Sequence, residues 1–171
     1  MWHYTGKHRP EFAEIPQAGQ ESVWDYPRPP KIVHDNREIV VQVDGQEIAR
    51  TTSGVRVLET ASPPTVYLPR QDVAIDRLER ASAGSFCEWK GRATYWTIRT
   101  GATVLPNAAW SYENPSNAFS AIVGYLSFYP ALLECTIAGE IVRPQPGGFY
   151  GGWVTNEIVG PYKGTPGTTG W

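Results

Sequence analysis

The sequence predicts a mainly β fold of antiparallel strands, and two observations carry that prediction. Its 171 residues include 17 glycines and 15 prolines, which interrupt helices, and seven Trp and nine Tyr, which favour strands. Three segments each show two short apolar runs about a turn that contains glycine, which is typical of a β-hairpin. We therefore expect antiparallel sheets with many turns and one short helix.

The three expected hairpins span residues 39–49, 95–104 and 135–142. Their turns fall at Asp44-Gly45, Gly101 and Gly139, and an Asp-Gly pair between apolar runs is a strong indication of a two-residue turn.

Two further elements follow from local patterns. Thr65 to Leu68 reads as a short strand because prolines bound it on both sides. The helix is expected at about 115–129, where apolar residues recur at three- and four-residue spacing. Ser116 can cap its start, and Pro130 stops it.

Length and composition predict a single β-rich domain over residues 32–171, preceded by an extended arm over residues 1–31. A chain of 171 residues is long enough to bury its own core. The arm is rich in proline and charge, as in the run Pro27-Arg28-Pro29-Pro30, which favours an extended backbone. It also carries too many aromatic side chains for a segment that stays in solvent, so we expect it to wrap over the domain.

Charge and hydropathy argue against two classes of partner. The net charge is −2 and the signs are interspersed, whereas duplex nucleic acid requires a concentrated basic face. No apolar run approaches the roughly 20 residues that cross a bilayer, and residues 1–10 lack the apolar segment of a signal peptide. These features predict a cytoplasmic protein that binds neither duplex nucleic acid nor a membrane.

The pattern of metal-ligating residues predicts no metal site. The two cysteines, Cys87 and Cys135, are far apart, neither lies in a C-x-x-C pair, and we expect both as free thiols. All three histidines lie in the first 34 residues, away from both cysteines in sequence. The sequence indicates neither a particular cofactor nor an oligomeric state.

Residues 87–92, Cys-Glu-Trp-Lys-Gly-Arg, place a thiol, an acid, an indole and two cations within six positions. In a strand, Glu88, Lys90 and Arg92 share one face. That face predicts a polar site in which Glu88 and Lys90 can shift each other's pKa for acid–base work. The alternative is an ordinary solvent-exposed face, with Cys87, Trp89 and Gly91 toward the core.

Two other segments carry candidate binding residues. In residues 107–112, Asn-Ala-Ala-Trp-Ser-Tyr, an extended chain points Trp110 and Tyr112 the same way, either as a pocket wall or as core filling. Residues 144–153, Pro-Gln-Pro-Gly-Gly-Phe-Tyr-Gly-Gly-Trp, either approach another group closely or simply turn. This second segment lacks the Lys-Ser/Thr ending of a phosphate loop.

Several of these segments together resemble the family catalogued as domain of unknown function 427. The residues that carry the resemblance are Arg56 to Thr60 with Pro63-Pro64, Glu88 to Gly91, Asn107 to Tyr112, Phe128 to Pro130, Pro144 to Thr155 and Gly160 to Gly164. The resemblance runs from about Trp24 to the C-terminus.

The resemblance implies a β-tent-like fold, in which two antiparallel sheets meet at an angle and leave a cleft between them. The C-x-x-C pairs of zinc-bearing β-tent proteins are absent, which implies a metal-free version. The family is sometimes labelled nucleotidyltransferase-like. The close-set carboxylates that hold two metal ions in such enzymes are missing here, and Asp72 and Asp76 are four residues apart.

The leading hypothesis is a small-molecule pocket, with the question of enzymatic activity left open. Its expected catalytic residues are Glu88 and Lys90, and its expected ligand-binding residues are Trp89, Arg92, Asn107, Trp110, Tyr112, Gln145, Tyr150 and Trp153. One alternative is a non-catalytic module whose aromatic side chains form a cage for a cationic group or a peptide end. Others are nucleotidyl transfer, as the family label suggests, and a purely structural role for these segments.

Overall fold

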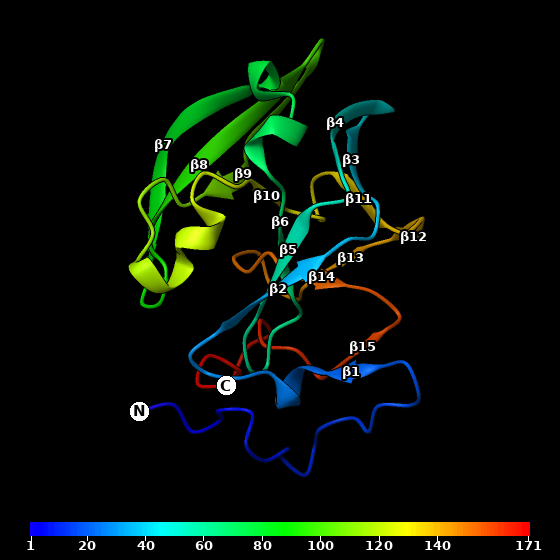
Figure 1. Ribbon diagram of the computed structural model, residues 1–171, viewed down its shortest axis with the longest axis vertical. Coiled ribbons are helices and arrows are strands. Elements are labelled where there is room, and N and C mark those ends of the chain that lie inside the picture. The colour runs from blue at the N-terminus through cyan, green and yellow to red at the C-terminus, as the bar shows by residue number, and fades with distance from the viewer.

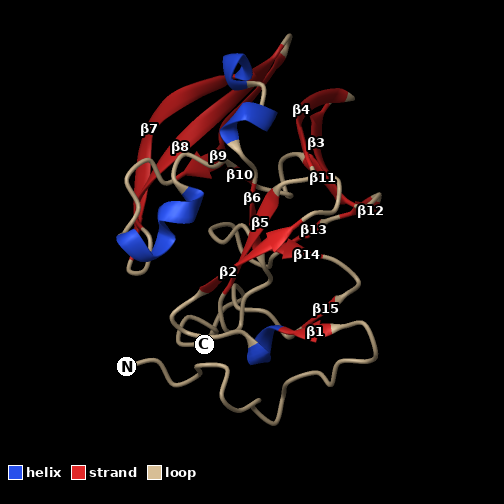
Figure 2. Ribbon diagram, in the orientation of Figure 1, coloured by secondary structure: helices blue, strands red, loops and turns tan.

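The computed structural model describes residues 1–171 and consists of short strands joined by turns and loops (Figures 1 and 2). The strands are β1 (Glu21–Ser22), β2 (Lys31–Asp35), β3 (Ile39–Val43), β4 (Gln46–Thr51), β5 (Gly54–Leu58), β6 (Thr65–Tyr67), β7 (Leu78–Cys87), β8 (Gly91–Thr100), β9 (Thr103–Ser111), β10 (Ser127–Phe128), β11 (Glu134–Ile137), β12 (Glu140–Ile141), β13 (Arg143–Pro144), β14 (Trp153–Val154) and β15 (Ile158–Val159). The helical segments are 3-10 turns: η1 (Val23–Asp25), η2 (Arg70–Asp72), η3 (Ile75–Arg77) and η4 (Asn117–Ile122). The prediction of a mainly β fold is confirmed.

Two four-stranded antiparallel sheets form the larger part of the molecule. One has the order β10-β9-β8-β7 and the other the order β12-β11-β3-β4. Figure 1 shows them on opposite sides of the upper half, with the three-stranded sheet β2-β5-β6 beneath and between them. Two two-stranded sheets, β1-β15 and β13-β14, complete the fold.

All three predicted hairpins are present. They are β3-β4, β8-β9 and β11-β12, and each pair is antiparallel. The first turn has positive φ at both Asp44 (51°) and Gly45 (74°), the backbone that a two-residue hairpin turn requires. Asp and Gly tolerate that backbone better than other residues, which explains why the sequence revealed the turn.

The helix predicted at 115–129 is wrong in length and in type. Only η4 forms, and Ser116 makes no side-chain cap to it. Gly124 then takes a positive φ of 70°, which ends any helical path, and the chain continues into β10. The apolar spacing instead reflects side chains such as Phe119 and Ile122, which are buried from the short 3-10 helix η4. No helix of the structure has the length and apolar character needed to cross a bilayer.

The largest apolar cluster joins the two four-stranded sheets. It includes Ile39 and Val41 of β3, Ile98 of β8 and Phe128 of β10, all inaccessible to solvent. A second cluster gathers around Tyr67, Trp110 and Tyr112 at the other end of β9. The two clusters fix both ends of β8 and β9, and the second borders the cavity described below.

The N-terminal residues pack against the rest of the chain. Trp24 is fully buried in a third cluster, and Phe12 and Trp171 stack with ring centroids 5.1 Å apart. Figure 1 shows these residues running across one end of the molecule, where β1 pairs with β15.

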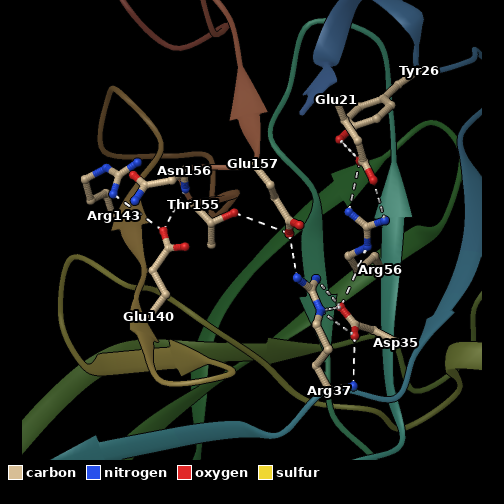
Figure 3. A network of polar contacts seen from close by, with 10 residues as sticks. All are labelled: Glu21, Tyr26, Asp35, Arg37, Arg56, Glu140, Arg143, Thr155, Asn156 and Glu157. Atoms are coloured by element: carbon tan, nitrogen blue, oxygen red, sulfur yellow. Dashed lines mark hydrogen bonds and ion pairs between the residues drawn. The ribbon is translucent and has the colours of Figure 1, made fainter. Parts of the chain in front are cut away.

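A polar network ties this end together (Figure 3). The Arg37 guanidinium donates to Asp35 Oδ2 at 2.7 Å and to Glu157 Oε1 at 2.8 Å. Arg56 donates to both carboxylate oxygens of Glu21 at 3.1 Å. The network joins β1 and β2 to β5 and to the segment before β15.

Candidate functional site

A cavity of about 340 Å³ lies where the β7-β8 turn, β6 and the end of β9 meet the glycine-rich segment 145–151. Its walls are predominantly aromatic. The aromatic residues that line it are Trp2, Tyr67, Phe86, Trp89, Tyr95, Trp110, Tyr112, Tyr129, Phe149 and Tyr150. Two acidic and two basic side chains, Glu59, Glu88, Lys90 and Lys163, also border it. This combination of apolar walls and few charges is typical of a small-molecule site.

The segment that carries Glu88 and Lys90 is a hairpin turn, which corrects the prediction of a strand face shared with Arg92. Residues 88–90 form the turn between β7 and β8, and Gly91 ends it with a φ of 99°. A turn does not alternate its side chains, so Lys90 is buried while Glu88 stays exposed at the mouth. Ser116 fixes the turn because its amide and hydroxyl donate to the carbonyls of Lys90 and Trp89.

Lys90 is the most unusual residue of the site. Its side chain lines the cavity with only 8% exposure and forms no ion pair with any carboxylate. Its Nζ lies 5.7 Å from the ring centre of Tyr112 and 5.5 Å from that of Phe119. Rings at that distance stabilise a cation only in part.

The surroundings of Lys90 keep its amine charged. Burial disfavours the ammonium, whereas the Tyr67 oxygen, the Glu59 carboxylate and a hydrogen bond with Cys87 favour it, and the pKa of Lys90 lies above its ordinary value. Burial also raises the pKa of Tyr67 and of Tyr112, which keeps both phenols neutral. The cavity therefore combines a fixed positive charge with phenolic hydroxyls.

A bulge in β9 positions the aromatic wall. The register between β8 and β9 shifts between the pairs Trp96–Ala109 and Ile98–Leu105, so β9 carries extra residues there. Bulges of this kind redirect the side chains that follow. Beyond the bulge, Trp110 and Tyr112 both face the cavity, and the Trp110 indole donates to the Tyr67 hydroxyl at 3.3 Å.

Glu59 borders the cavity just after β5 and is already engaged. Its Oε1 accepts from Arg28 Nε at 3.1 Å and from the Trp89 indole at 3.3 Å. Arg28 is buried, and it also donates to the Trp171 carbonyl at 2.8 Å. Glu59 therefore holds Trp89 in place and is neutralised by Arg28 rather than by Lys90.

The glycine-rich segment closes the cavity from the opposite side. A Cβ at Gly151 would collide with the Trp110 ring, so only glycine allows this approach. Gln145 is buried, donates to the Lys163 carbonyl at 2.7 Å and accepts from the Gly152 amide at 3.0 Å. These contacts explain the glycines as a close approach of backbone to the aromatic wall.

Trp2 covers the mouth. Its indole donates to Glu88 Oε1 at 2.8 Å, while its ring lies 4.0 Å from the Arg28 guanidinium and 4.6 Å from Lys163 Nζ. Burial, followed by the charge of Arg28, lowers the pKa of Lys163.

Seven of the ten predicted site residues border one cavity, and three do not. Those that border it are Glu88, Trp89, Lys90, Trp110, Tyr112, Gln145 and Tyr150. Arg92 is exposed on β8, and Asn107 sits in the β9 bulge beside a neighbouring hollow. Trp153 is a core residue, 1% exposed, whose indole donates to the Phe128 carbonyl, so the prediction that it forms a pocket wall is wrong.

Sequence reasoning missed several residues of the cavity. Tyr67, Glu59, Tyr129 and Lys163 come from separate parts of the chain, and no local pattern joins them. The available signals were indirect: Glu59, Tyr129 and Lys163 lie in segments that carry the family resemblance, and Tyr67 lies in the short proline-bounded strand.

The site offers no obvious cage for a metal. The structure contains no group of three His, Cys, Asp or Glu side chains placed to hold one. Cys87 and Cys135 are both free thiols, and burial raises the pKa of Cys135.

Fold and site together define a mainly β protein with an aromatic-walled cavity that encloses a lysine. The chain belongs to the family described as a domain of unknown function (DUF427), whose model, labelled NTP_transf_9, matches residues 31–139. The matched range is shorter than the predicted resemblance. It contains Lys90, Trp110 and Tyr112, whereas Trp2 and the glycine-rich segment lie outside it. No curated protein matches the chain.

Proposed function

We propose that the protein binds a small molecule in the aromatic cavity, and that the ligand presents an anionic oxygen to Lys90. The observation that carries this proposal is the enclosed ammonium of Lys90, which has no carboxylate partner. A buried charge without a partner is unfavourable, so an anion that reaches it gains a desolvated ion pair. Tyr67 and Tyr112 add hydroxyls, and the surrounding rings favour a planar ligand body.

The charge of the cavity disfavours the alternative of a cage for a cationic group. Lys90 and Lys163 both border it, Glu59 is already paired with Arg28, and Glu88 lies exposed at the mouth, where it accepts from the Trp2 indole. A cationic ligand would face two like charges at close range. The alternative of nucleotidyl transfer is less well supported, because the structure contains no group of three His, Cys, Asp or Glu side chains placed to hold a metal ion.

A catalytic role is compatible with this site but takes a different form from a simple acid–base pair. Lys90 is protonated and acts as a fixed positive charge that stabilises negative charge on the substrate. Glu88, exposed at the mouth, is the proposed proton carrier.

The test compares benzoate with benzylamine, which share a ring and differ in charge. Ligand-observed NMR and thermal denaturation measure binding to the wild type, Lys90→Met and Lys90→Arg. We expect benzoate to bind, benzylamine not to bind, and Lys90→Met to weaken benzoate at least about tenfold, as expected for loss of a charged hydrogen bond. Lys90→Met replaces a buried charge by an apolar chain of similar length, so the fold is expected to survive.

Lys31→Met is the matched control, since Lys31 is exposed on β2 away from the cavity. It should leave benzoate binding unchanged. Binding of benzylamine in place of benzoate, or full affinity for benzoate in Lys90→Met, would overturn the proposal.

A further inference from the structure

A second hollow, of about 500 Å³, lies beside the cavity. Its lining is largely apolar and includes Ala83 of β7, Pro106 of β9 and the loop residues Pro130 and Leu132. No charged side chain borders it. Leu132 is 47% exposed and Phe149 61% exposed, which are high values for large apolar side chains.

The two hollows have a common wall. Six residues line both of them: Ser85, Tyr95, Tyr129, Gln145, Phe149 and Tyr150. Hydrogen bonds hold this wall together, because Tyr95 and Ser85 share one at 3.0 Å and the Tyr129 hydroxyl donates to the Phe149 carbonyl at 3.0 Å. Burial, followed by a hydrogen bond with Tyr95, raises the pKa of Tyr129, so the Tyr129 phenol is neutral.

One side of this wall is the glycine-rich segment, which is anchored at both ends and open at its tip. Gly147 packs against the Gly164 backbone and Gly151 against Trp110, whereas Gly148, beside Phe149, has no atom near the position of a Cβ. The contact between Tyr129 and this segment is a single hydrogen bond near the surface, whose net contribution is small. Opening it would join the hollows.

We propose that the two hollows are the two ends of one elongated site, and that the ligand is an amphipathic acid. Its anionic head and planar body occupy the aromatic cavity against Lys90, and its apolar tail passes Tyr129 and Phe149 into the second hollow. The inference rests on the proposed function, which supplies the position of the head. An apolar tail is the expected occupant because the second hollow is largely apolar, has no charged side chain in its lining and shares six lining residues with the head site.

The test uses a series of para-substituted benzoates with hydrogen, ethyl and butyl tails, measured by titration of intrinsic tryptophan fluorescence. Each methylene that enters the second hollow should tighten binding, by up to about fourfold when fully buried. We expect 4-butylbenzoate to bind at least tenfold more tightly than benzoate.

Two matched variants locate the tail. Ala83→Trp fills the second hollow and should abolish the gain from the butyl tail while leaving benzoate affinity unchanged. Ser82→Trp, on the adjacent exposed residue that lines neither hollow, should keep the full gain. Tyr129→Phe removes the bond to Phe149 and should tighten 4-butylbenzoate by about threefold to tenfold, the net value of one hydrogen bond.

The outcomes separate the two proposals. If benzoate binds through Lys90 and the tail adds nothing, or if Ala83→Trp keeps the gain, the elongated site is wrong and the anion site stands. If neither benzoate nor its alkyl derivatives respond to Lys90→Met, the proposed function itself fails.

Discussion

Gly151 determines the shape of the cavity at the scale of one residue. Its backbone lies against the Trp110 ring so closely that any side chain would displace the indole. Trp110 in turn donates to Tyr67 and packs with Tyr129 at a centroid distance of 4.6 Å. A change of one methyl group at position 151 therefore acts on three aromatic residues of the site.

Gly151→Ala should destabilise the protein and weaken ligand binding. Overpacking of this kind costs about 1–3 kcal/mol, which corresponds to a fall in Tm of roughly 3 °C or more for a chain of this length. Gly148→Ala is the matched control, because no atom lies within 4 Å of the added methyl group. Thermal denaturation of both variants decides the point, and equal Tm values for the two would contradict the close approach described here.

At the scale of elements, the N-terminal arm supplies Trp2 to the mouth of the cavity. The Trp2 ring lies close to two cations, Arg28 and Lys163, and its indole donates to Glu88 in the β7-β8 turn. We expect a ligand that enters by the mouth to displace this side chain, and we expect the arm to slow entry.

Trp2→Ala should raise the association rate of benzoate by several-fold, as measured by stopped-flow fluorescence. Trp2→Phe separates the two kinds of contact, because it keeps a ring beside Arg28 and Lys163 and loses the hydrogen bond to Glu88. Its rate should lie between those of the wild type and Trp2→Ala. His8→Ala, an exposed substitution in the same arm, is the control. An association rate that falls in Trp2→Ala would show that Trp2 belongs to the binding surface and not to the gate.

The contrast between hairpins and helix shows which elements the sequence can predict. A hairpin turn such as Asp44-Gly45 depends on the backbone preferences of two adjacent residues, so the local pattern sufficed. The apolar spacing at 115–129 matched a helix, but Gly124 and the pairing of β10 with β9 imposed another path. Such tertiary pairing is absent from a local pattern.

The candidate site divides in the same way. The turn at residues 88–90, the Trp110 pair with Tyr112 and the glycine-rich segment are each compact in sequence, and they could be singled out there. The burial of Lys90 could not be predicted, because it depends on residues distant in sequence, among them Tyr67 from β6 and Phe119 from η4. Trp153 shows the opposite case. It is predicted to line the cavity because it follows four glycines closely, but it lies in the apolar core.

At the scale of the whole molecule, the network of Figure 3 joins segments from both ends of the chain. Burial alone would raise the pKa of Asp35, but hydrogen bonds from Arg37 outweigh it and leave the pKa below its ordinary value of 3.8. Burial alone would also raise the pKa of Glu21, but hydrogen bonds from Arg56 and Tyr26 outweigh it and leave the pKa below its ordinary value of 4.5. Both carboxylates are therefore charged in the folded protein at neutral pH.

Because of these pKa shifts, the stability of the folded protein depends on pH. A carboxylate whose folded pKa is depressed contributes its full stabilisation above the unfolded pKa, and loses it as the pH falls through the lower folded value. For Asp35 and Glu21 the loss begins near pH 4.5 and continues below pH 3.8. We expect Tm to change little between pH 7 and pH 5.5 on their account and to fall steeply below pH 4.5.

Asp35→Asn tests whether this network is responsible. Asp35 accepts several hydrogen bonds from Arg37 and its side chain is only 4% exposed, so at pH 7 the substitution should cost on the order of 2 kcal/mol. Because Asn does not titrate, the fall in Tm between pH 5.5 and pH 3.5 should also be smaller than in the wild type. Asp25→Asn, at an exposed pair with Arg9, should change neither quantity appreciably. If Asp35→Asn lowers Tm equally at every pH, its carboxylate contributes through shape and hydrogen bonding alone, and the acid sensitivity must arise at other groups.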